Sequence, residues 1–158
     1  MDQEVQNIVT ALQLAPHPEG GYFRETFRSP ASTAIYFLLP AGVFSAWHRV
    51  KKSDEIWHHY AGDPVELHLI DESGSYSKII LGSDLANGEQ PQAIVPANTW
   101  QAALPVGNRY ALCGCTVAPA FDFANFEMPK REQLFTLFPQ HRAVIENLTR
   151  GAELSLTQ

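Results

Sequence analysis

Hydrophobic and polar residues alternate over short segments through most of this chain. In residues 22–28, Phe23 and Phe27 share one face of an extended strand, whereas the polar residues between them share the other. This period of two is typical of a strand with one buried side. Similar segments, separated by turn signals such as Asn87-Gly88, predict further strands at 33–39, 42–49, 55–60, 65–70, 77–81, 93–95, 99–103 and 110–117. Many short strands at this spacing predict an all-β sandwich or barrel.

The two ends of the chain show helical spacing instead. Asp2 is a good capping residue, and apolar residues recur at intervals of three and four from Val5 to Leu12. Towards the other end, a second apolar stripe predicts two short helices that are separated at Pro139. The length of 158 residues is that of one domain with a sizeable core, so we expect a single domain over residues 1–158.

A spaced motif lies in the centre of the chain. Gly42, His48, Glu55 and Gly62 follow the order Gly, five residues, His, one residue, a second position, four residues, Glu, six residues, Gly. This pattern resembles the first conserved motif of the cupin superfamily. In that motif the second position is also a His, whereas here it is Val50.

The resemblance extends beyond this motif. The second cupin motif, Pro, one residue, Gly, two residues, His, is best matched by Pro96, Asn98 and Gln101, so Gln101 replaces its His. Segments such as HPEGGYFRETFRS and SDEIWHHYAGDPVELHLI are similar to one small family of cupins, cupin-5, whose function is unknown. The resemblance implies a double-stranded β-helix (a jelly-roll barrel), a pocket inside the barrel, a homodimer and structural kinship with sugar-nucleotide epimerases.

Charge and hydropathy exclude several partners. The chain has a formal net charge of −6 and only 11 Lys and Arg residues, so it lacks the basic stripe that nucleic-acid phosphates require. The longest apolar stretch, residues 34–43, is too short for a bilayer, which takes about 20 residues, and the acidic N-terminal segment is unlike a secretory signal. We therefore expect a cytoplasmic protein with no membrane or nucleic-acid partner, in which Cys113 and Cys115 are small core residues.

The resemblance also assigns metal-ligand positions. It places His48, Glu55 and Gln101 where cupins usually hold a metal with three His and one Glu. A neutral carboxamide is a poor zinc ligand, whereas the harder manganese and iron(II) ions accept oxygen ligands. Two alternatives follow: a weakly bound divalent ion (Mn, Fe or Zn), or a metal-free pocket that requires no cofactor and whose His and Glu bond to each other or to ligand.

Without a metal, His48 and Glu55 are candidate catalytic residues for proton transfer. A carboxylate orients an imidazole and stabilises its cationic form, so the ring can act as a general base, with Tyr22, Tyr60 or Tyr110 as the acid. Sugar-nucleotide epimerases, which this chain resembles in its barrel, use a His base and a Tyr acid. We therefore predict a small-molecule-binding protein, an isomerase or epimerase acting on a sugar-like or anionic molecule. The alternatives are a non-catalytic ligand-binding protein and a weakly metal-dependent lyase or oxygenase.

Further side chains are candidates for binding the ligand. Trp57 and His59 share strand parity with the motif Glu, and His68 lies on the next strand. Arg24 can clamp a carboxylate or phosphate with two parallel hydrogen bonds, and Arg28 extends the row. The structural alternatives are a core tryptophan, a hydrogen-bonded histidine on a sheet face and a solvated arginine.

Overall fold

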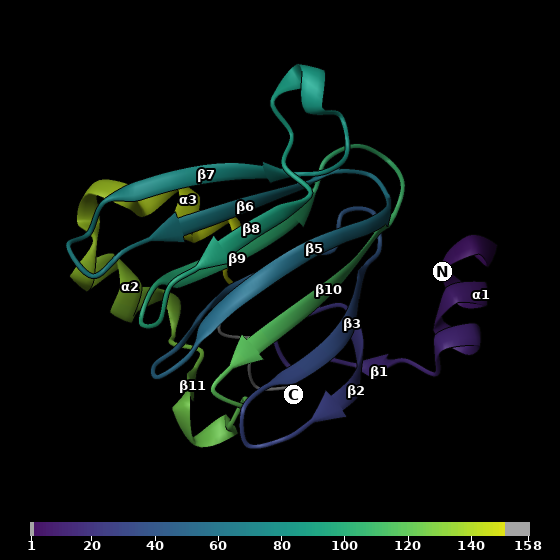
Figure 1. Cartoon of the computed structure of the whole chain (residues 1–158). Coiled ribbons are helices and arrows are strands. Elements are labelled where there is room, and N and C mark those ends of the chain that lie inside the picture. Colours follow the sequence, from purple (N-terminus) through teal and green to yellow (C-terminus); the bar gives the residue numbers. More distant parts are fainter. Residues whose placement is uncertain (1, 151–158) are drawn as a thin grey trace.

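The computed structural model describes residues 2–150 and folds them into two antiparallel sheets that face each other (Figure 1). The 6-stranded sheet has, in spatial order, β1 (Ala15–Pro16), β2 (Tyr22–Arg28), β3 (Thr33–Leu39), β10 (Ala111–Ala118), β5 (Asp54–Gly62) and β8 (Gln92–Val95). The 5-stranded sheet has β11 (Phe126–Glu127), β4 (Ser45–Val50), β9 (Trp100–Pro105), β6 (Val65–Ile70) and β7 (Tyr76–Leu81). Each sheet takes strands from distant parts of the chain, which confirms the predicted double-stranded β-helix.

A helix at the N-terminus covers the outside of the first sheet. It is α1 (Gln3–Leu12), and it begins where the Asp2 carboxylate accepts the backbone N–H of Val5 at 2.8 Å. Val5 packs in a buried cluster with Leu38 from that sheet and with Tyr110, which directly precedes β10. The predicted cap and apolar stripe are therefore confirmed.

The C-terminal helices cover the outside of the second sheet. They are α2 (Arg131–Leu137) and α3 (Arg142–Asn147), separated by a 3-10 turn at Pro139–His141, as predicted. Their buried residues are Leu134 and Ile145, which pack with Trp47, Ile70 and Trp100 of the sheet. No helix within residues 2–150 is long and apolar enough to cross a membrane.

The core between the sheets fills one end of the barrel. Leu39, Leu67 and Ala111 are buried there in one cluster with Phe37 and Trp57. At the opposite end the inward-facing side chains leave a cavity. The packed end thus stabilises the barrel. At the other end, the inward-facing side chains of the strands line the cavity.

A bulge in β2 changes which of its side chains face inward. Glu25 pairs with Ile35 and Phe27 with Ala34, so Thr26 is an extra residue that opposes nothing on β3. An extra residue reverses the alternation of side chains beyond it. The strand therefore presents different residues before and after this point.

The bulge corrects one sequence-based prediction. Strict alternation placed Phe23 and Phe27 on the same face, and this is wrong. Phe23 packs against the core opposite Phe37, whereas Phe27 is 54% exposed. Arg28 was predicted on the outer face but lies on the inner face, where it pairs with Thr33 and lines the cavity.

The other predicted strands are confirmed with small differences at their ends. β3 and β6 have the predicted bounds. β4 begins at Ser45, later than predicted, because Gly42 has a φ of 75° in the turn before it. Cys113 and Cys115 are buried free thiols that face inward, as expected.

Candidate functional site

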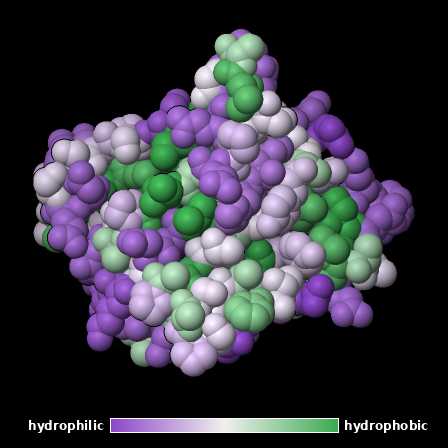
Figure 2. All heavy atoms as spheres, in the orientation of Figure 1, coloured by the Kyte–Doolittle hydropathy of each residue, from purple (hydrophilic) through white to green (hydrophobic). Residues whose placement is uncertain are grey.

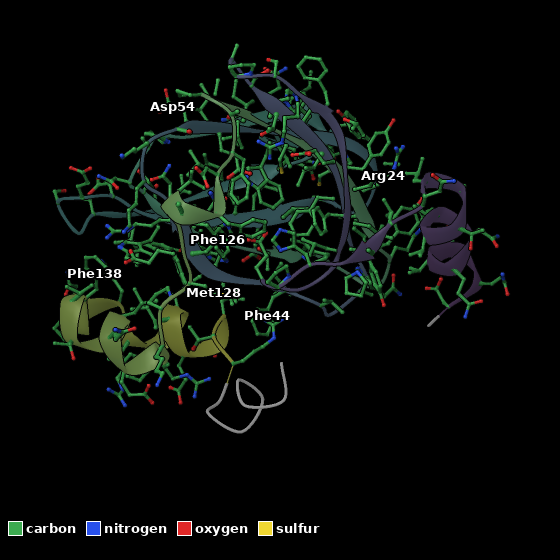
Figure 3. The ribbon with its side chains drawn as sticks, turned by 90° about the horizontal axis from the view of Figure 1, so that it is seen from below. Arg24, Phe44, Asp54, Phe126, Met128 and Phe138 are labelled. Carbon is green, nitrogen blue, oxygen red and sulfur yellow. The ribbon has the colours of Figure 1, made fainter. Side chains whose placement is uncertain are left out.

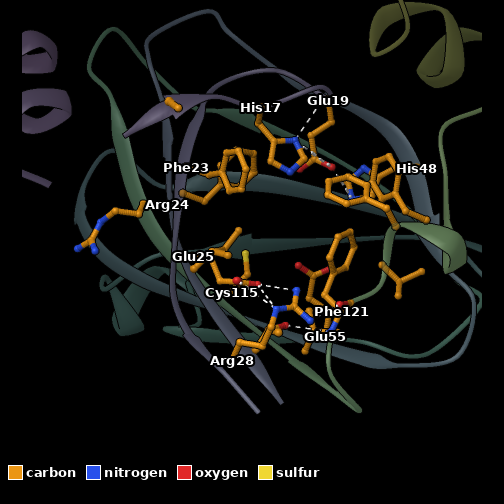
Figure 4. Close-up of a pocket in the computed structure, with 18 of the residues that line it drawn as sticks. His17, Glu19, Phe23, Arg24, Glu25, Arg28, His48, Glu55, Cys115 and Phe121 are labelled. Atoms are coloured by element: carbon orange, nitrogen blue, oxygen red, sulfur yellow. Dashed lines mark hydrogen bonds and ion pairs between the residues drawn. The ribbon is translucent and has the colours of Figure 1, made fainter. Parts of the chain in front are cut away.

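A cavity of about 440 Å³ lies between the two sheets at the open end of the barrel. Its apolar wall residues include Phe23, Ile35, Phe37, Val50, Val117 and Phe126, and its ionisable ones include His17, Glu19, Glu25, Arg28, His48 and Glu55. Figure 3 views the barrel from this end, with Phe126 near the middle of the opening. Figure 4 shows the polar side chains turned toward one another across the cavity.

His48 and Glu19 form a buried contact on one wall. The His48 ring donates from Nδ1 to the Ala46 carbonyl at 2.8 Å, because a carbonyl oxygen only accepts. Nε2 of the same ring lies 3.1 Å from Glu19 Oε2. His48 is 3% exposed and Glu19 is 5% exposed, so the contact is shielded from bulk water.

Burial determines where the proton of this pair resides. It raises the pKa of the Glu19 carboxyl to about 8 and lowers the pKa of the His48 imidazole, because each charged form loses hydration. At neutral pH the pair is therefore uncharged, and the Glu19 carboxyl donates its proton to the lone pair of His48 Nε2. The two groups share one proton in a hydrogen bond that faces the cavity.

Glu19 reaches the cavity from the loop between β1 and β2. Arg150 donates to its backbone carbonyl at 3.0 Å and so fixes the loop. Gly20 has a φ of 114°, and a Cβ there would clash with the Phe44 carbonyl oxygen, so glycine is required. Glu19 was not predicted from the sequence as a site residue, although the glycine pair after it marks a constrained loop.

Glu55 faces the cavity from β5 with a hydrogen-bonded chain behind it. Gln101 donates from Nε2 to Glu55 Oε1 at 2.7 Å, and its own Oε1 accepts the Trp57 indole N–H at 2.9 Å. Burial raises the pKa of Glu55. His48 and Glu55 both line the cavity, but they bond to other partners and not to one another.

Cys115 lies beside Glu55 on the cavity wall. Burial holds the pKa of its thiol well above its usual range. The thiol therefore stays protonated at neutral pH and is a poor nucleophile.

The donors at the two motif positions do not fit a metal ion. Val50 lines the cavity where the second motif His would stand, and both ends of the Gln101 carboxamide are already hydrogen-bonded. The remaining lone pair of His48 faces the Glu19 carboxyl. Among residues 2–150, no group of three or more His, Cys, Asp or Glu side chains is placed to hold a metal ion.

Three of the predicted ligand-binding residues lie behind or away from the cavity wall. Trp57 is 1% exposed in the core, and Gln101 lies between it and Glu55. His59 lies farther along β5, where its Nε2 donates to the Asp63 carbonyl at 2.9 Å. None of the three lines the cavity, so their contribution is to hold the fold and to orient Glu55.

His68 faces the opposite side of the second sheet from the cavity. Leu67 and Leu69 point into the barrel core, so alternation turns His68 outward. Its Nδ1 lies 2.7 Å from the Tyr76 hydroxyl, and its Nε2 lies 3.2 Å from Glu66 Oε1. His68 was a candidate for binding the ligand because it lies on the strand after β5. The alternation of side chains along β6 instead places it on the outer face of the sheet.

The bulge in β2 separates the two arginines of that strand. Arg24 turns its guanidinium away from the cavity, over the Tyr36 ring at 5.6 Å (Figure 4). Arg28 lies at the cavity mouth, where its Nη2 is 2.7 Å from Glu25 Oε1 and its Nη1 donates to the Phe121 carbonyl at 3.0 Å. Arg24 also lines the cavity, but its Nε already donates to the Leu12 carbonyl at 2.7 Å, so Arg28 is the arginine better placed to meet a ligand.

The candidate tyrosines do not line the cavity. Tyr22 and Tyr110 pack in the cluster with α1, and Tyr60 is 55% exposed. Within the described residues, the acidic hydrogens on the cavity wall belong to carboxyl groups and to the Cys115 thiol. The sequence did not decide which of the three tyrosines is the acid. In the structure the acidic group beside His48 is the carboxyl group of Glu19.

Phenylalanines from the segment after β10 form an apolar rim. The 3-10 turn η2 (Phe123–Asn125) and β11 bring the Phe121 and Phe123 rings to 4.8 Å and the Phe123 and Phe126 rings to 5.7 Å. The Phe126 ring also lies 5.4 Å from the His48 ring. This rim shields the His48–Glu19 contact and offers an apolar surface to a ligand.

Two solved structures share this fold over nearly the whole chain. A hypothetical protein from Leishmania major has a TM-score of 0.87 and 33% identity, and the match covers 92% of this chain and 98% of that one. Protein SO0799 from Shewanella oneidensis has a TM-score of 0.88 and 35% identity over 92% and 96% of the two chains. The uncharacterized protein YML079W of Saccharomyces cerevisiae is 29% identical in an alignment 155 residues long that covers 81% of this chain and 76% of the yeast protein.

A family model described as Cupin superfamily (DUF985) matches residues 6–129. That range contains both motif segments, the loop that carries Glu19 and all the strands of the two sheets. The agreement of the spaced motif, the barrel topology and this match shows that the chain belongs to the DUF985 family of the cupin superfamily.

Proposed function

We propose that this cupin binds a small polar molecule in the barrel cavity and transfers protons on it, as an isomerase or epimerase does. The observation that carries the proposal is the buried contact of 3.1 Å between His48 Nε2 and Glu19 Oε2 in a cavity that Glu55 also lines. Burial moves the pKa of the Glu19 carboxyl toward neutral, where a carboxyl group exchanges protons readily.

The positions of the two buried carboxyl groups suit an epimerase. Such an enzyme needs one group to remove a proton from carbon and another to return a proton from a different side. Glu19 comes from the loop before β2 and Glu55 from β5, and burial raises the pKa of both. We assign Glu19, coupled to His48, and Glu55 to these two roles.

The cavity walls favour a sugar-like ligand. An anionic group on such a ligand would lie at the mouth of the cavity. A volume of about 440 Å³ is typical of small-molecule sites. The aromatic wall suits the carbon face of a sugar, and the buried carboxyl groups suit its hydroxyls. Arg28 lies at the mouth, so an anionic group would bind there in place of Glu25. Deeper in the cavity, the burial that raises the pKa of Glu19 and Glu55 also disfavours a negative charge on the ligand.

A ligand-binding protein without catalysis is the second candidate. The observation in its favour is the chain from Trp57 through Gln101 to Glu55, in which each hydrogen bond is made without a ligand. Such a chain holds Glu55 rigid, as a binding site requires. The same hydrogen bonds occupy Gln101 and so disfavour the weakly metal-dependent lyase or oxygenase.

Ligand screening followed by hydrogen exchange tests the proposal. Sugars, sugar phosphates and organic acids are screened by thermal shift, and each binder is incubated with the protein in D₂O while NMR follows exchange of its C–H hydrogens. We expect exchange with the wild type and with the control His58→Gln, whose ring bonds to Thr116 on the outer face at 3.0 Å. His48→Gln should abolish it. Unchanged exchange in His48→Gln would refute the proposal, and binding without exchange would support the second candidate.

A further inference from the structure

His17 is a cavity residue whose hydrogen position is set by the backbone. The backbone N–H of Glu19 donates to His17 Nδ1 at 3.1 Å, so this nitrogen must carry a lone pair. Burial lowers the pKa of His17 to about 3, so the ring is neutral in the physiological range. A neutral ring with a lone pair on Nδ1 carries its hydrogen on Nε2.

The Nε2–H group faces the cavity and has no partner there. The His17 side chain is 7% exposed, and within residues 2–150 no hydrogen bond is made by its Nε2. The ring is held edge-on against Phe23, with centroids 4.5 Å apart, and tilted against Phe37 at 5.5 Å. Figure 4 shows it projecting into the cavity beside Glu19. A donor that faces a cavity and has no protein partner there is available to a ligand.

We propose that the Nε2–H of His17 donates a hydrogen bond to a substrate carbonyl oxygen, and that the substrate is an α-hydroxy aldehyde or ketone. This inference rests on the proposed function of the cavity in proton transfer. A neutral imidazole can only donate from this nitrogen, so it selects an acceptor oxygen. Proton removal from carbon in turn requires a neighbouring carbonyl group, because the carbonyl takes up the electron pair.

The reaction balances with the groups on the cavity walls. Glu55, when ionised, removes the proton from the carbon next to the carbonyl, and the C–H electron pair forms a C=C bond as negative charge develops on the oxygen. The hydrogen bond from the His17 Nε2–H to this oxygen strengthens as the charge develops. Glu19 then returns a proton to the carbon, which restores the carbonyl, and the two carboxyl groups re-equilibrate their protons with water.

A matched pair of probes tests the substrate class. Dihydroxyacetone phosphate and glycerol 3-phosphate differ only in the carbonyl group. With wild-type protein in D₂O, we expect faster exchange of the hydrogens next to the carbonyl of the first compound than without protein. His17→Phe keeps a ring against Phe23 but removes the donor, and should slow this exchange by about 100-fold, a typical effect of losing one such donor. His17→Gln restores an N–H group and should recover part of the rate.

A measurement on the wild type keeps the inference testable if a variant does not fold. In protein with ¹⁵N-labelled histidine, we expect His17 to carry its hydrogen on Nε2 throughout pH 6–8, and this resonance to move with dihydroxyacetone phosphate more than with glycerol 3-phosphate. A hydrogen on Nδ1, equal responses to both probes, or unchanged exchange in His17→Phe would overturn the inference. If other compounds exchange through His48 but dihydroxyacetone phosphate does not, the proposed function stands and the carbonyl assignment fails.

Discussion

At the scale of single residues, one backbone hydrogen bond fixes which nitrogen of the His48 ring can accept a proton from Glu19. The His48 ring gives its Nδ1 hydrogen to the Ala46 carbonyl, so only a lone pair remains to face Glu19. Arg150 reaches the backbone of Glu19 and not its carboxyl group. Burial raises the pKa of Glu19 more than the Ser45 hydroxyl and the Arg150 charge lower it, so this buried carboxyl group keeps its proton.

The raised pKa of Glu19 predicts how stability depends on pH. Between its ordinary pKa of 4.5 and the folded value of about 8, the carboxyl is ionised in the unfolded chain and protonated in the fold. The free energy of unfolding therefore falls as pH rises through this range, by at most about 1.4 kcal/mol per pH unit. Glu19→Gln is neutral at every pH and should show a smaller decrease in urea unfolding between pH 6.5 and 8.

The pH window of this test avoids an opposite effect from His17. The pKa of His17 is lowered to about 3, so His17 destabilises the fold only as pH falls below about 6.5, where the unfolded ring is protonated. Above that pH it is neutral in both states. Equal slopes for wild type and Glu19→Gln between pH 6.5 and 8 would show that Glu19 is not protonated in the fold.

Restoring the missing motif histidines should create a metal site. In Val50→His/Gln101→His, two imidazoles would join His48 and Glu55, and we expect zinc or manganese affinity to rise by orders of magnitude in calorimetric titration. Losing Gln101 leaves the Trp57 indole without a partner, at about 1–3 kcal/mol, and removes one donor from Glu55. The same variant with His48→Ala is the control and should lose the gain. Affinity no better than wild type would mean that these positions are not equivalent to cupin ligands.

Sequence spacing located the residues of the site that lie on strands. His48 and Glu55 have fixed offsets from turn glycines, and Val50 lines the cavity where the motif placed it. His17 and Glu19 lie in a loop, where no periodicity shows which way a side chain points. Their contribution depends on hydrogen bonds to distant residues such as Arg150, which local patterns do not contain.

At the scale of elements, the bulge at Thr26 determines which arginine meets a ligand. Most strand positions were predictable because turn residues bound the apolar alternation. A bulge adds one residue without an obvious signal in composition, so every side chain after it was assigned to the wrong face. Phe27 and Arg28 were both misplaced for this single reason.

The two arginines of β2 give a matched test of this geometry. Inorganic phosphate is the probe for the cavity mouth. At ten times its dissociation constant, a ligand stabilises the fold by about 1.4 kcal/mol, which raises Tm by about 3–6 °C in a chain of this size. We expect this shift in wild type and in Arg24→Ala, and its loss in Arg28→Ala. Loss of the shift in Arg24→Ala alone would place the anion on the outer face of the sheet.

At the scale of the whole molecule, the packed end of the barrel and the outer helices leave few apolar surfaces open. Figure 2 shows apolar residues in separate patches among hydrophilic ones, with an apolar tip on the protruding turn η1 (Leu85–Asn87). Leu85 at that tip is 67% exposed, and Phe27 beside the edge of the first sheet is 54% exposed. Of these two, only Phe27 lies on a strand with an open edge.

That open edge supports the prediction that two copies associate. Within residues 2–150, β1 pairs only with Tyr22 and Phe23, so the rest of β2 has no strand on its outer side. An uncovered edge with an exposed phenylalanine favours pairing with a second copy about a two-fold axis. We expect light scattering at micromolar concentration to give twice the mass of one chain.

Phe27→Asp should shift the protein toward the monomer, because it places a charge in the contact. Leu85→Asp, a change at another exposed apolar residue that lies far from this edge, should not. A monomeric wild type would rule out the dimer, and dissociation by Leu85→Asp instead would move the interface to the tip of η1.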